Sequence, residues 1–230
     1  MFFPFYDWTL FIVIPGLLLA MWAQFKVSSA FRKYDKVRAR SGVTGAELAR
    51  RLLGQAGLSD IIVEQVRGEL TDHYDPSKRV LRLSSGVYES ASIAALGVAA
   101  HECGHAIQDG EGYVLLGMRG AIVPVVSIGS NLSWPLFLAG LIFSWDPLML
   151  AGIVLFALTV VFTLITLPVE FNASGRALAV LESGGYLDAE ELVGARKVLS
   201  AASMTYVASA LNAILQLARL LLLSGNRRRR

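Results

Sequence analysis

Long apolar blocks alternate with polar stretches along this chain. Residues 8–27 are predominantly apolar and numerous enough to cross a bilayer as a helix. Residues 120–169 contain a single charged residue, Asp146, which lies beside Pro147 between two further apolar runs. The pattern predicts a membrane-spanning helix within residues 1–27 and a transmembrane hairpin within residues 119–169.

Residues 28–118 have the mixed polar composition of a globular region. Thr44 and Glu47 have the spacing of a capping box, and the leucines that follow mark a short amphipathic helix. The pattern further predicts strands at Ile61–Val66 and Val80–Leu83, and a helix from about Ala91 to Gln108. The expected fold class is a mostly α membrane protein with transmembrane helices and a small α+β domain.

Polar side chains form a stripe on the last predicted helix, which runs from about residue 201 to residue 223. They recur at spacings of four and three residues, at Thr205, Ser209, Asn212, Gln216 and Arg219. After a helical region at residues 170–203, we expect residues 204–230 to form an amphipathic helix associated with the membrane surface. Its basic tail, Arg227 to Arg230, would then contact anionic cytoplasmic lipid, whereas a crossing would place these arginines outside.

Composition agrees with a membrane protein that carries a polar domain. The 230 residues are 54% hydrophobic and 17% charged, and the mean hydropathy is +0.54, which is too apolar for an ordinary soluble domain. The net charge of +3 does not indicate nucleic-acid binding, because the basic residues flank apolar segments. The single cysteine, Cys103, excludes an internal disulfide. No basic residue precedes the first apolar segment, so we expect no cleavable signal peptide.

The distribution of basic residues also predicts the orientation in the membrane. Six basic residues lie between positions 26 and 40 and none lies before them, which places the N-terminus outside and residues 28–118 in the cytoplasm. A hairpin returns the chain to the side from which it left. His105 and Glu170 are therefore expected on the same side of the membrane.

The segment His101-Glu102-Cys103-Gly104-His105 contains two of the three histidines of the chain. Residues four apart lie on one face of a helix, so both imidazoles can bind one zinc ion per chain. Glu102 would then serve as the general base that accepts a proton from water, as in a metalloprotease. Cys103 points away from this face, and we expect it to be a packed core residue.

A catalytic zinc ion usually has three protein ligands, so one more ligand is needed. Glu170 is the main candidate, because it follows the hairpin and the sequence there indicates the start of a helix that could pack against the histidine helix. Asp109 is the alternative, but a ligand on the same straight helix does not easily approach the metal from a third direction.

Three parts of the sequence resemble the YugP-like membrane zinc metallopeptidases: residues 101–108, residues 72–76 together with 81–84, and the segment at Glu170. The resemblance covers nearly the full chain and implies a zincin-like domain of the gluzincin type in a bacterial inner (plasma) membrane protein. The chain is more distantly similar to HtpX-type proteases, whose Glu-x-x-Ala-Asp segment corresponds here to Glu170, Ala173 and Ser174. Ser174 replaces the aspartate that supports a ligand histidine in those enzymes, and a hydroxyl could accept the same hydrogen bond.

These features predict a membrane-embedded zinc endopeptidase that acts on membrane or membrane-proximal polypeptides, with its site on the cytoplasmic side. Candidates for stabilising the oxyanion are His73, Tyr74, Arg176 and Tyr206, although His73 could equally be a turn histidine bonded to backbone. The strand at Val80–Ser84 could present an edge to a substrate strand, or it could simply be a core strand. Two other functions stay open: a zinc-stabilised membrane scaffold without proteolysis, and an amidase or lipid-modifying hydrolase. The substrate and the oligomeric state are not determined by the sequence.

Overall fold

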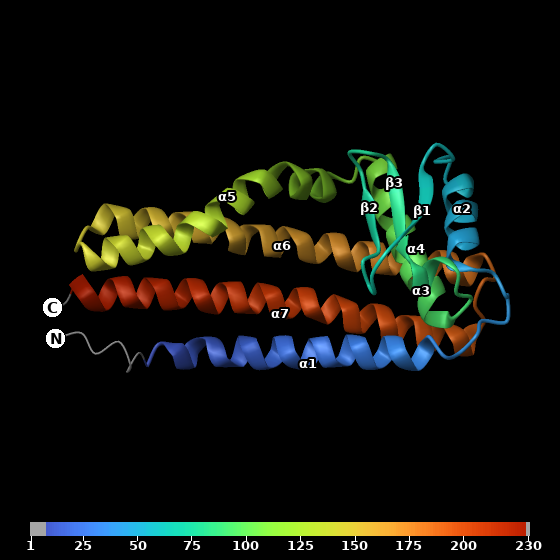
Figure 1. Cartoon of the computed structure of the whole chain (residues 1–230), viewed down its shortest axis with the longest axis horizontal. Coiled ribbons are helices and arrows are strands. Elements are labelled where there is room, and N and C mark those ends of the chain that lie inside the picture. Colours follow the sequence, from blue (N-terminus) through green and yellow to red (C-terminus); the bar gives the residue numbers. More distant parts are fainter. Residues whose placement is uncertain (1–7, 229–230) are drawn as a thin grey trace. The chain divides into compact units, whose positions relative to one another are not determined.

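The computed structural model describes residues 8–228 as helices and a small sheet (Figure 1). The helices are α1 (Leu10–Tyr34), α2 (Gly45–Gln55), α3 (Ser85–Tyr88), α4 (Ile93–Gly110), α5 (Val114–Ile142), α6 (Asp146–Ser183) and α7 (Ala189–Arg228). The strands are β1 (Ile62–Val66), β2 (His73–Asp75) and β3 (Val80–Ser84). The side chains of the terminal run Arg227–Arg230, which the sequence predicts to contact lipid, lie outside the described residues.

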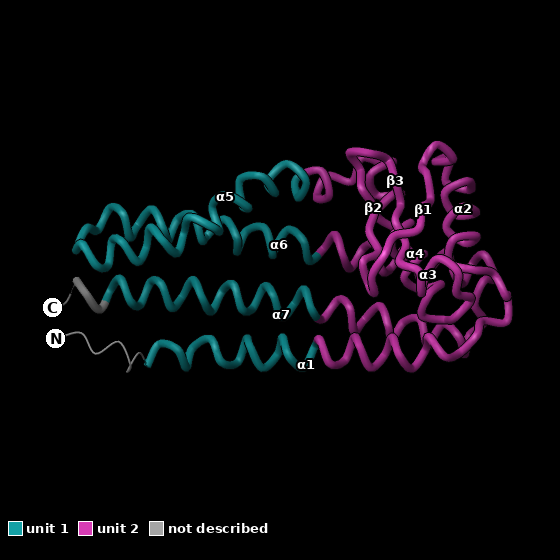
Figure 2. The backbone as a smooth tube through the Cα atoms, in the orientation of Figure 1, with its two compact units in different colours: residues 1–23, 118–167, 205–230 teal, residues 24–117, 168–204 magenta. Residues whose placement is uncertain are grey.

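The chain divides into two compact units, shown in teal and magenta in Figure 2. Unit 1 comprises residues 1–23, 118–167 and 205–230, and unit 2 comprises residues 24–117 and 168–204. The long helices α1, α6 and α7 each contribute residues to both units. Unit 2 therefore joins the segment before the hairpin to the segment after it.

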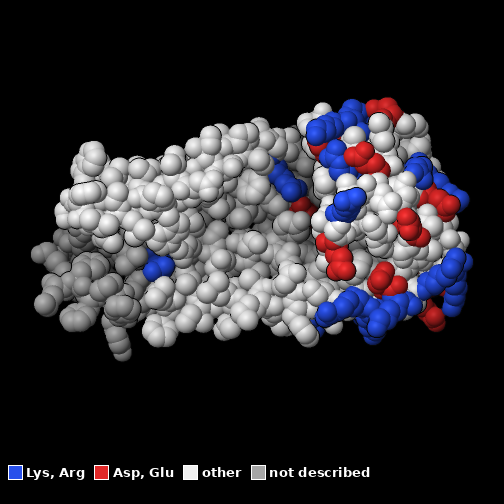
Figure 3. All heavy atoms as spheres, viewed as in Figure 1, with Lys and Arg blue, Asp and Glu red and all other residues white. Residues whose placement is uncertain are grey.

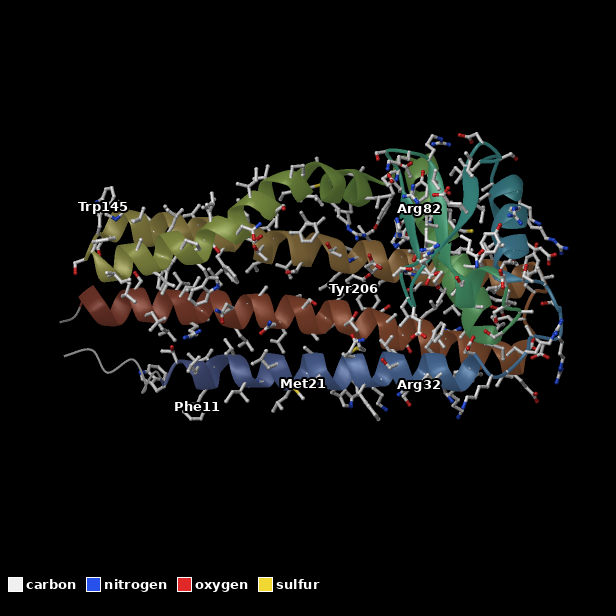
Figure 4. All side chains as sticks on the ribbon, in the orientation of Figure 1. Phe11, Met21, Arg32, Arg82, Trp145 and Tyr206 are labelled. Atoms are coloured by element: carbon white, nitrogen blue, oxygen red, sulfur yellow. The ribbon has the colours of Figure 1, made fainter. Side chains whose placement is uncertain are left out.

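Unit 1 consists of apolar helices. In the described part of the chain, α1, α5, α6 and α7 are each long and apolar enough to cross a membrane. Large apolar side chains are exposed on them, as Phe11 (72% exposed) and Met21 (69% exposed) show on α1 (Figure 4). Apolar surfaces of this extent suit lipid, so the chain is an integral membrane protein. The long apolar helices expected around residues 8–27 and on either side of Asp146 are present.

Small residues allow α5 and α6 to pack closely within unit 1. A Cβ atom at Gly152 of α6 would lie 2.6 Å from the carbonyl oxygen of Ser133 on α5, so no larger residue fits without moving the backbone. Phe137, Met149 and Leu220 fill the buried cluster that these helices form with α7. The hairpin predicted from the sequence is thus a tightly packed helix pair.

The polar stripe of α7 makes contacts between helices within unit 1. Asn212 packs against α1, where a Cβ atom at Gly16 would lie 3.1 Å from the Cα atom of Asn212. The Nε atom of Arg219 donates to the hydroxyl of Thr9 at 3.2 Å, and its guanidinium lies 5.7 Å from the ring centroid of Trp134. Polar side chains commonly link helices in this way inside membranes. By length and composition α7 could also cross a membrane, and the surface helix expected from the sequence stays a prediction.

Unit 2 contains a three-stranded sheet with the strand order β1-β3-β2. The central strand β3 pairs parallel with β1 and antiparallel with β2. Arg82 of β3, labelled in Figure 4, reinforces the sheet by bonding Glu64 on β1 at 2.6 Å and Asp75 on β2 at 3.1 Å. The two expected strands are confirmed. The expectation that residues 80–84 offer an edge to a substrate is wrong, because β3 is paired on both sides.

The core of unit 2 packs α2 and the sheet against α4. Leu48 of α2, Leu81 of β3 and Leu96 of α4 are each fully buried in it. Burial of each such side chain contributes about 1.5–3 kcal/mol. The predicted capping box begins α2, since the side chains of Thr44 and Glu47 each accept a hydrogen bond from the other residue's backbone N–H. This core holds α4, the histidine helix, beside the sheet.

Charge separates the two units. On the face shown in Figure 3, acidic and basic side chains gather on unit 2 and are sparse on unit 1. Among the residues whose side chains the structure describes, unit 1 carries only Arg119, Asp146 and Arg219 as charged residues. The distribution fits a unit 1 surrounded by lipid and a unit 2 surrounded by water.

Candidate metal centre

The helix α4 presents His101 and His105 on one face. It begins at Ser92, whose hydroxyl accepts a hydrogen bond from the backbone N–H of Ala95 at 3.1 Å, and its apolar residues are buried in the core of unit 2. The predicted boundaries, Ala91 to Gln108, are confirmed to within two residues. The spacing of four residues brings the ring centroids of the two histidines to 4.8 Å from each other.

Glu170 on α6 completes a cluster with these histidines inside unit 2. Its Oε2 atom lies 3.3 Å from Nε2 of His101 and 3.6 Å from Nε2 of His105, and the residue is 1% exposed. The three candidate ligand atoms lie within 4.8 Å of one another, close enough to hold a metal ion. One detail differs from the prediction: Glu170 lies inside the continuous helix α6 and does not begin a helix.

A glycine makes this approach of α6 to α4 possible. A Cβ atom at Gly104, between the two histidines, would lie 2.8 Å from the carbonyl oxygen of Ala173 and 3.2 Å from its Cα atom. Ala173 itself is fully buried. The backbones of the two helices therefore meet at this point, where only glycine leaves enough space.

The donor atoms of the cluster suit zinc. The Nδ1 atoms of both rings are engaged in hydrogen bonds: that of His101 lies 3.1 Å from the hydroxyl of Ser174, and that of His105 lies 3.0 Å from the side-chain oxygen of Gln108. Each Nε2 atom therefore faces the Glu170 carboxylate. Two imidazole nitrogens and one carboxylate oxygen form a common ligand set for catalytic zinc.

The electrostatics of the site favour positive charge. Burial lowers the pKa of His105, but its hydrogen bond to Glu170 and the negative charges of Glu102 and Glu170 outweigh burial, so the pKa is raised above its ordinary value. The carboxylates thus attract either protons or a cation to the histidine pair. A metal ion would satisfy the same demand.

Glu102 of α4 contacts the edge strand β2. Its Oε2 atom accepts a hydrogen bond from the backbone N–H of Tyr74 at 3.0 Å, and the residue is 9% exposed. A backbone donor cannot rotate away as a side chain can, so β2 fixes one oxygen of the carboxylate. Figure 1 shows β2 alongside α4.

Asp109, the alternative third ligand, has other partners. Its Oδ2 atom accepts a hydrogen bond from the hydroxyl of Tyr74 at 2.8 Å and lies 4.0 Å from Nη1 of Arg79. Burial and this hydrogen bond raise the pKa of Tyr74 well above its ordinary value, so the phenol keeps the proton that it donates. Among the described residues, the group able to hold a metal comprises His101, His105 and Glu170.

Two of the residues expected to stabilise an oxyanion, His73 and Arg176, have other partners. The ring of His73 contacts the backbone oxygen of Thr71 through Nδ1 at 2.8 Å, as a turn histidine would. The guanidinium of Arg176 pairs with Glu111 at 2.7 Å. Tyr206, labelled in Figure 4, lies on the part of α7 that belongs to unit 1. The geometry therefore singles out none of these side chains as the oxyanion donor.

Two residues of the site are absent from the sequence prediction: Gln108 and Asn172. Gln108 is fully buried and contacts both His105 and α6, and Asn172 receives one of its hydrogen bonds. Gln108 lies three residues after His105, among mostly apolar residues of the same helix. This lone amide is the signal that could have revealed it. Asn172 has no comparable signal.

Comparisons with known proteins bear on this arrangement. The model of a family described as "Putative neutral zinc metallopeptidase" matches residues 9–225, which include His101, His105 and Glu170. A relative from Bacillus subtilis (strain 168), named "Putative membrane protease YugP", is 52% identical over 219 residues, which cover 95% of this chain and 97% of the relative. No solved structure matches the chain significantly.

Proposed function

Because the chain belongs to the neutral zinc metallopeptidase family whose model it matches, we propose that it is a membrane-embedded zinc endopeptidase with Glu102 as the general base. The observation that carries the proposal is the convergence of the candidate ligand atoms of His101, His105 and Glu170 within 4.8 Å, with Glu102 next to His101 on α4. The relative's name, a membrane protease, supports the same reaction class.

The residues of the site supply complementary parts of peptide hydrolysis. Zinc held by His101, His105 and Glu170 would polarise the scissile carbonyl and activate water. Glu102 accepts the proton of the attacking water and delivers it to the leaving amine. The backbone N–H of Tyr74 holds the Glu102 carboxylate in place between these two transfers. The hydroxyl of Ser174 supports His101 in the position that an aspartate occupies in HtpX-type proteases.

The basic residues support a site on the cytoplasmic side of the membrane, and the relative from Bacillus subtilis supports a bacterial plasma membrane. If α1, α5, α6 and α7 all cross, the segments of unit 2 that connect them lie on one side and both termini lie on the other. Six basic residues between positions 26 and 40 precede the sheet, and they outnumber the four of the Arg227–Arg230 run, which favours the cytoplasm for unit 2. The substrate would then be a polypeptide within or near the membrane. A topology reporter fused after Arg230 should report the outer side, and a cytoplasmic signal would contradict a fourth span.

The decisive test compares Glu102→Gln with the wild-type chain in detergent, using an unstructured protein such as casein and a membrane-anchored peptide as substrates. The variant should keep its zinc and lose about 10²–10⁴-fold in hydrolysis rate, because amide nitrogen and oxygen cannot accept the proton. Glu69→Gln, the same change at an exposed residue, should leave the rate unchanged.

Two results would contradict the proposal. Hydrolysis by Glu102→Gln at the wild-type rate would remove the general base assigned here. A wild-type chain that binds zinc and cleaves neither substrate would favour the alternative function, a zinc-stabilised membrane scaffold.

A further inference from the structure

A chain of hydrogen bonds within unit 2 runs from an ion pair to the buried ring of His105. At its outer end, Nη2 of Arg176 lies 2.7 Å from the carboxylate of Glu111, and Nε of Arg176 donates to Oδ1 of Asn172 at 2.8 Å. A guanidinium has donors and no acceptor. The atom of Asn172 that faces Arg176 must therefore be its oxygen, which fixes the orientation of this amide.

The orientation of Asn172 determines that of Gln108. The Nε2 atom of Gln108 lies 2.8 Å from Oδ1 of Asn172 and 2.9 Å from the backbone oxygen of Val169. Both neighbours are acceptors, so the amide group of Gln108 must direct its two N–H bonds toward them. The oxygen of Gln108 is left facing the opposite direction, toward α4.

The oxygen of Gln108 in turn fixes the proton of His105. It lies 3.0 Å from Nδ1 of His105, and an amide oxygen only accepts, so Nδ1 must carry the hydrogen. A neutral imidazole then has its free electron pair on Nε2, the nitrogen 3.6 Å from Oε2 of Glu170. Gln108 is 0% exposed, so water does not reach its side chain. Loss of its oxygen would therefore leave the buried Nδ1–H of His105 without this hydrogen-bond partner.

The other histidine is held less strictly. Nδ1 of His101 contacts the hydroxyl of Ser174, which can either donate or accept. The hydroxyl of Ser174 in turn lies 3.5 Å from that of Ser203, at the limit of a hydrogen bond. Of the two networks, the one at His105 ends in Arg176, whose guanidinium donates hydrogen bonds and accepts none.

We propose that Gln108 is a positioning residue for His105, that it fixes the tautomer able to bind zinc through Nε2, and that Arg176 sets its orientation through Asn172. The inference rests on the proposed function, since it concerns how His105 presents its ligand nitrogen. Through Nδ1 of His105 and the backbone oxygen of Val169, Gln108 also ties the His105 ring to α6, the helix that carries Glu170.

Two substitutions at position 108 separate positioning from a merely structural link between helices. Gln108→Met keeps the size of the side chain and removes all its hydrogen bonds. Gln108→Glu keeps an acceptor for Nδ1 of His105 but cannot donate to Val169 or Asn172 when ionised. Positioning therefore predicts that glutamate rescues the site, and a structural link predicts that it does not.

Zinc affinity of the metal-free, full-length chain in detergent, titrated against a competing chelator, is the readout. We expect Gln108→Met to bind zinc about 10–100-fold more weakly than wild type. Gln108→Glu should bind within about tenfold of wild type, because a carboxylate supports a ligand histidine at least as well. Gln65→Met, the same change at an exposed residue of β1, should not alter the affinity, and thermal unfolding of the metal-free chains reports whether each variant folds.

The proposal is overturned if Gln108→Met binds zinc as tightly as wild type, or if the glutamate variant is folded and as weak as the methionine variant. If Gln108→Met does not fold, Arg176→Met provides a second comparison, and a loss of affinity in the same direction is expected there. Because the readout is zinc binding, it is distinct from the test of proteolysis. A wild-type chain that binds zinc but cleaves no peptide would refute the proposed function and leave this comparison valid.

Discussion

Gly104 lies where the backbones of α4 and α6 meet, and its replacement by alanine should open the metal centre. The new Cβ atom would lie 2.8 Å from the carbonyl oxygen of Ala173, about 0.6 Å inside the 3.4 Å at which ordinary contact begins. Backbone cannot rotate away as a flexible side chain can, so the helices must separate by about this distance. The histidines on α4 would then move relative to Glu170 on α6.

The magnitudes show that zinc binding should respond more strongly than stability. Overpacking typically costs about 1–3 kcal/mol, but alanine regains about 1 kcal/mol of helix propensity over glycine. The net loss of folding free energy for Gly104→Ala is therefore about 0–2 kcal/mol. Zinc–ligand distances tolerate only about 0.2 Å, so a displacement of roughly 0.6 Å should weaken zinc binding by about tenfold or more.

The assay is zinc titration of the metal-free chain together with its thermal unfolding. Gly97→Ala is the matched control, because it lies on the same helix and its Cβ atom would make an ordinary contact at 3.7 Å with Ala195. That variant should bind zinc normally and unfold at the same or a higher temperature. Unchanged zinc affinity in Gly104→Ala would refute the argument that this glycine sets the distance between the ligand helices.

Three other predictions follow from the structure. Gly152→Val should destabilise unit 1 by about 1–3 kcal/mol in detergent, because its Cβ atom would lie 2.6 Å from the oxygen of Ser133. Gly120→Val is the control, because apart from its own local helix backbone no atom lies within 4 Å of its Cβ. Equal stabilities of the two variants would contradict the packing. Burial raises the pKa of the Cys103 thiol, so a maleimide should label it only after unfolding. Rapid labelling of the native chain would be inconsistent with its buried position. Removing zinc with a chelator should lower the midpoint temperature of unfolding, since zinc at about 100 times its dissociation constant adds about 2.7 kcal/mol to the free energy of unfolding. An unchanged midpoint would argue against a bound metal.

The local elements could be predicted because their signals are local. The capping box at Thr44, the strand segments on either side of the turn and the histidine helix follow from spacing and residue type. The strand β2 could not be found in this way, because three residues are too few to show alternation. Its contribution to the site is a backbone N–H at Tyr74, and backbone groups leave no signal in the sequence.

The candidate site could be predicted only in part, for a similar reason. Spacing places His101 and His105 on one face, and the geometry of a hairpin brings Glu170 to the same side of the membrane. Neither argument gives the contact that brings α6 to α4, which depends on the absence of a side chain at Gly104. The orientation of Gln108 likewise depends on α6, a helix more than sixty residues away in sequence.

The polar stripe of α7 shows how one pattern can suit two placements. Polar residues at helical spacing fit a membrane surface, and they also fit contacts with other helices inside a membrane. The length of the helix and its contacts with Gly16 and Thr9 of the N-terminal region are compatible with the second placement, and neither can be read from the stripe itself.

The measurement that tests the central claim most directly is the zinc content of the purified full-length chain, by elemental analysis, in wild type, Glu170→Ala and Asp109→Ala. A three-ligand site at His101, His105 and Glu170 predicts about one zinc per chain in wild type and in Asp109→Ala, and little in Glu170→Ala. Zinc retained by a folded Glu170→Ala chain, or lost from Asp109→Ala, would contradict the ligand set proposed here.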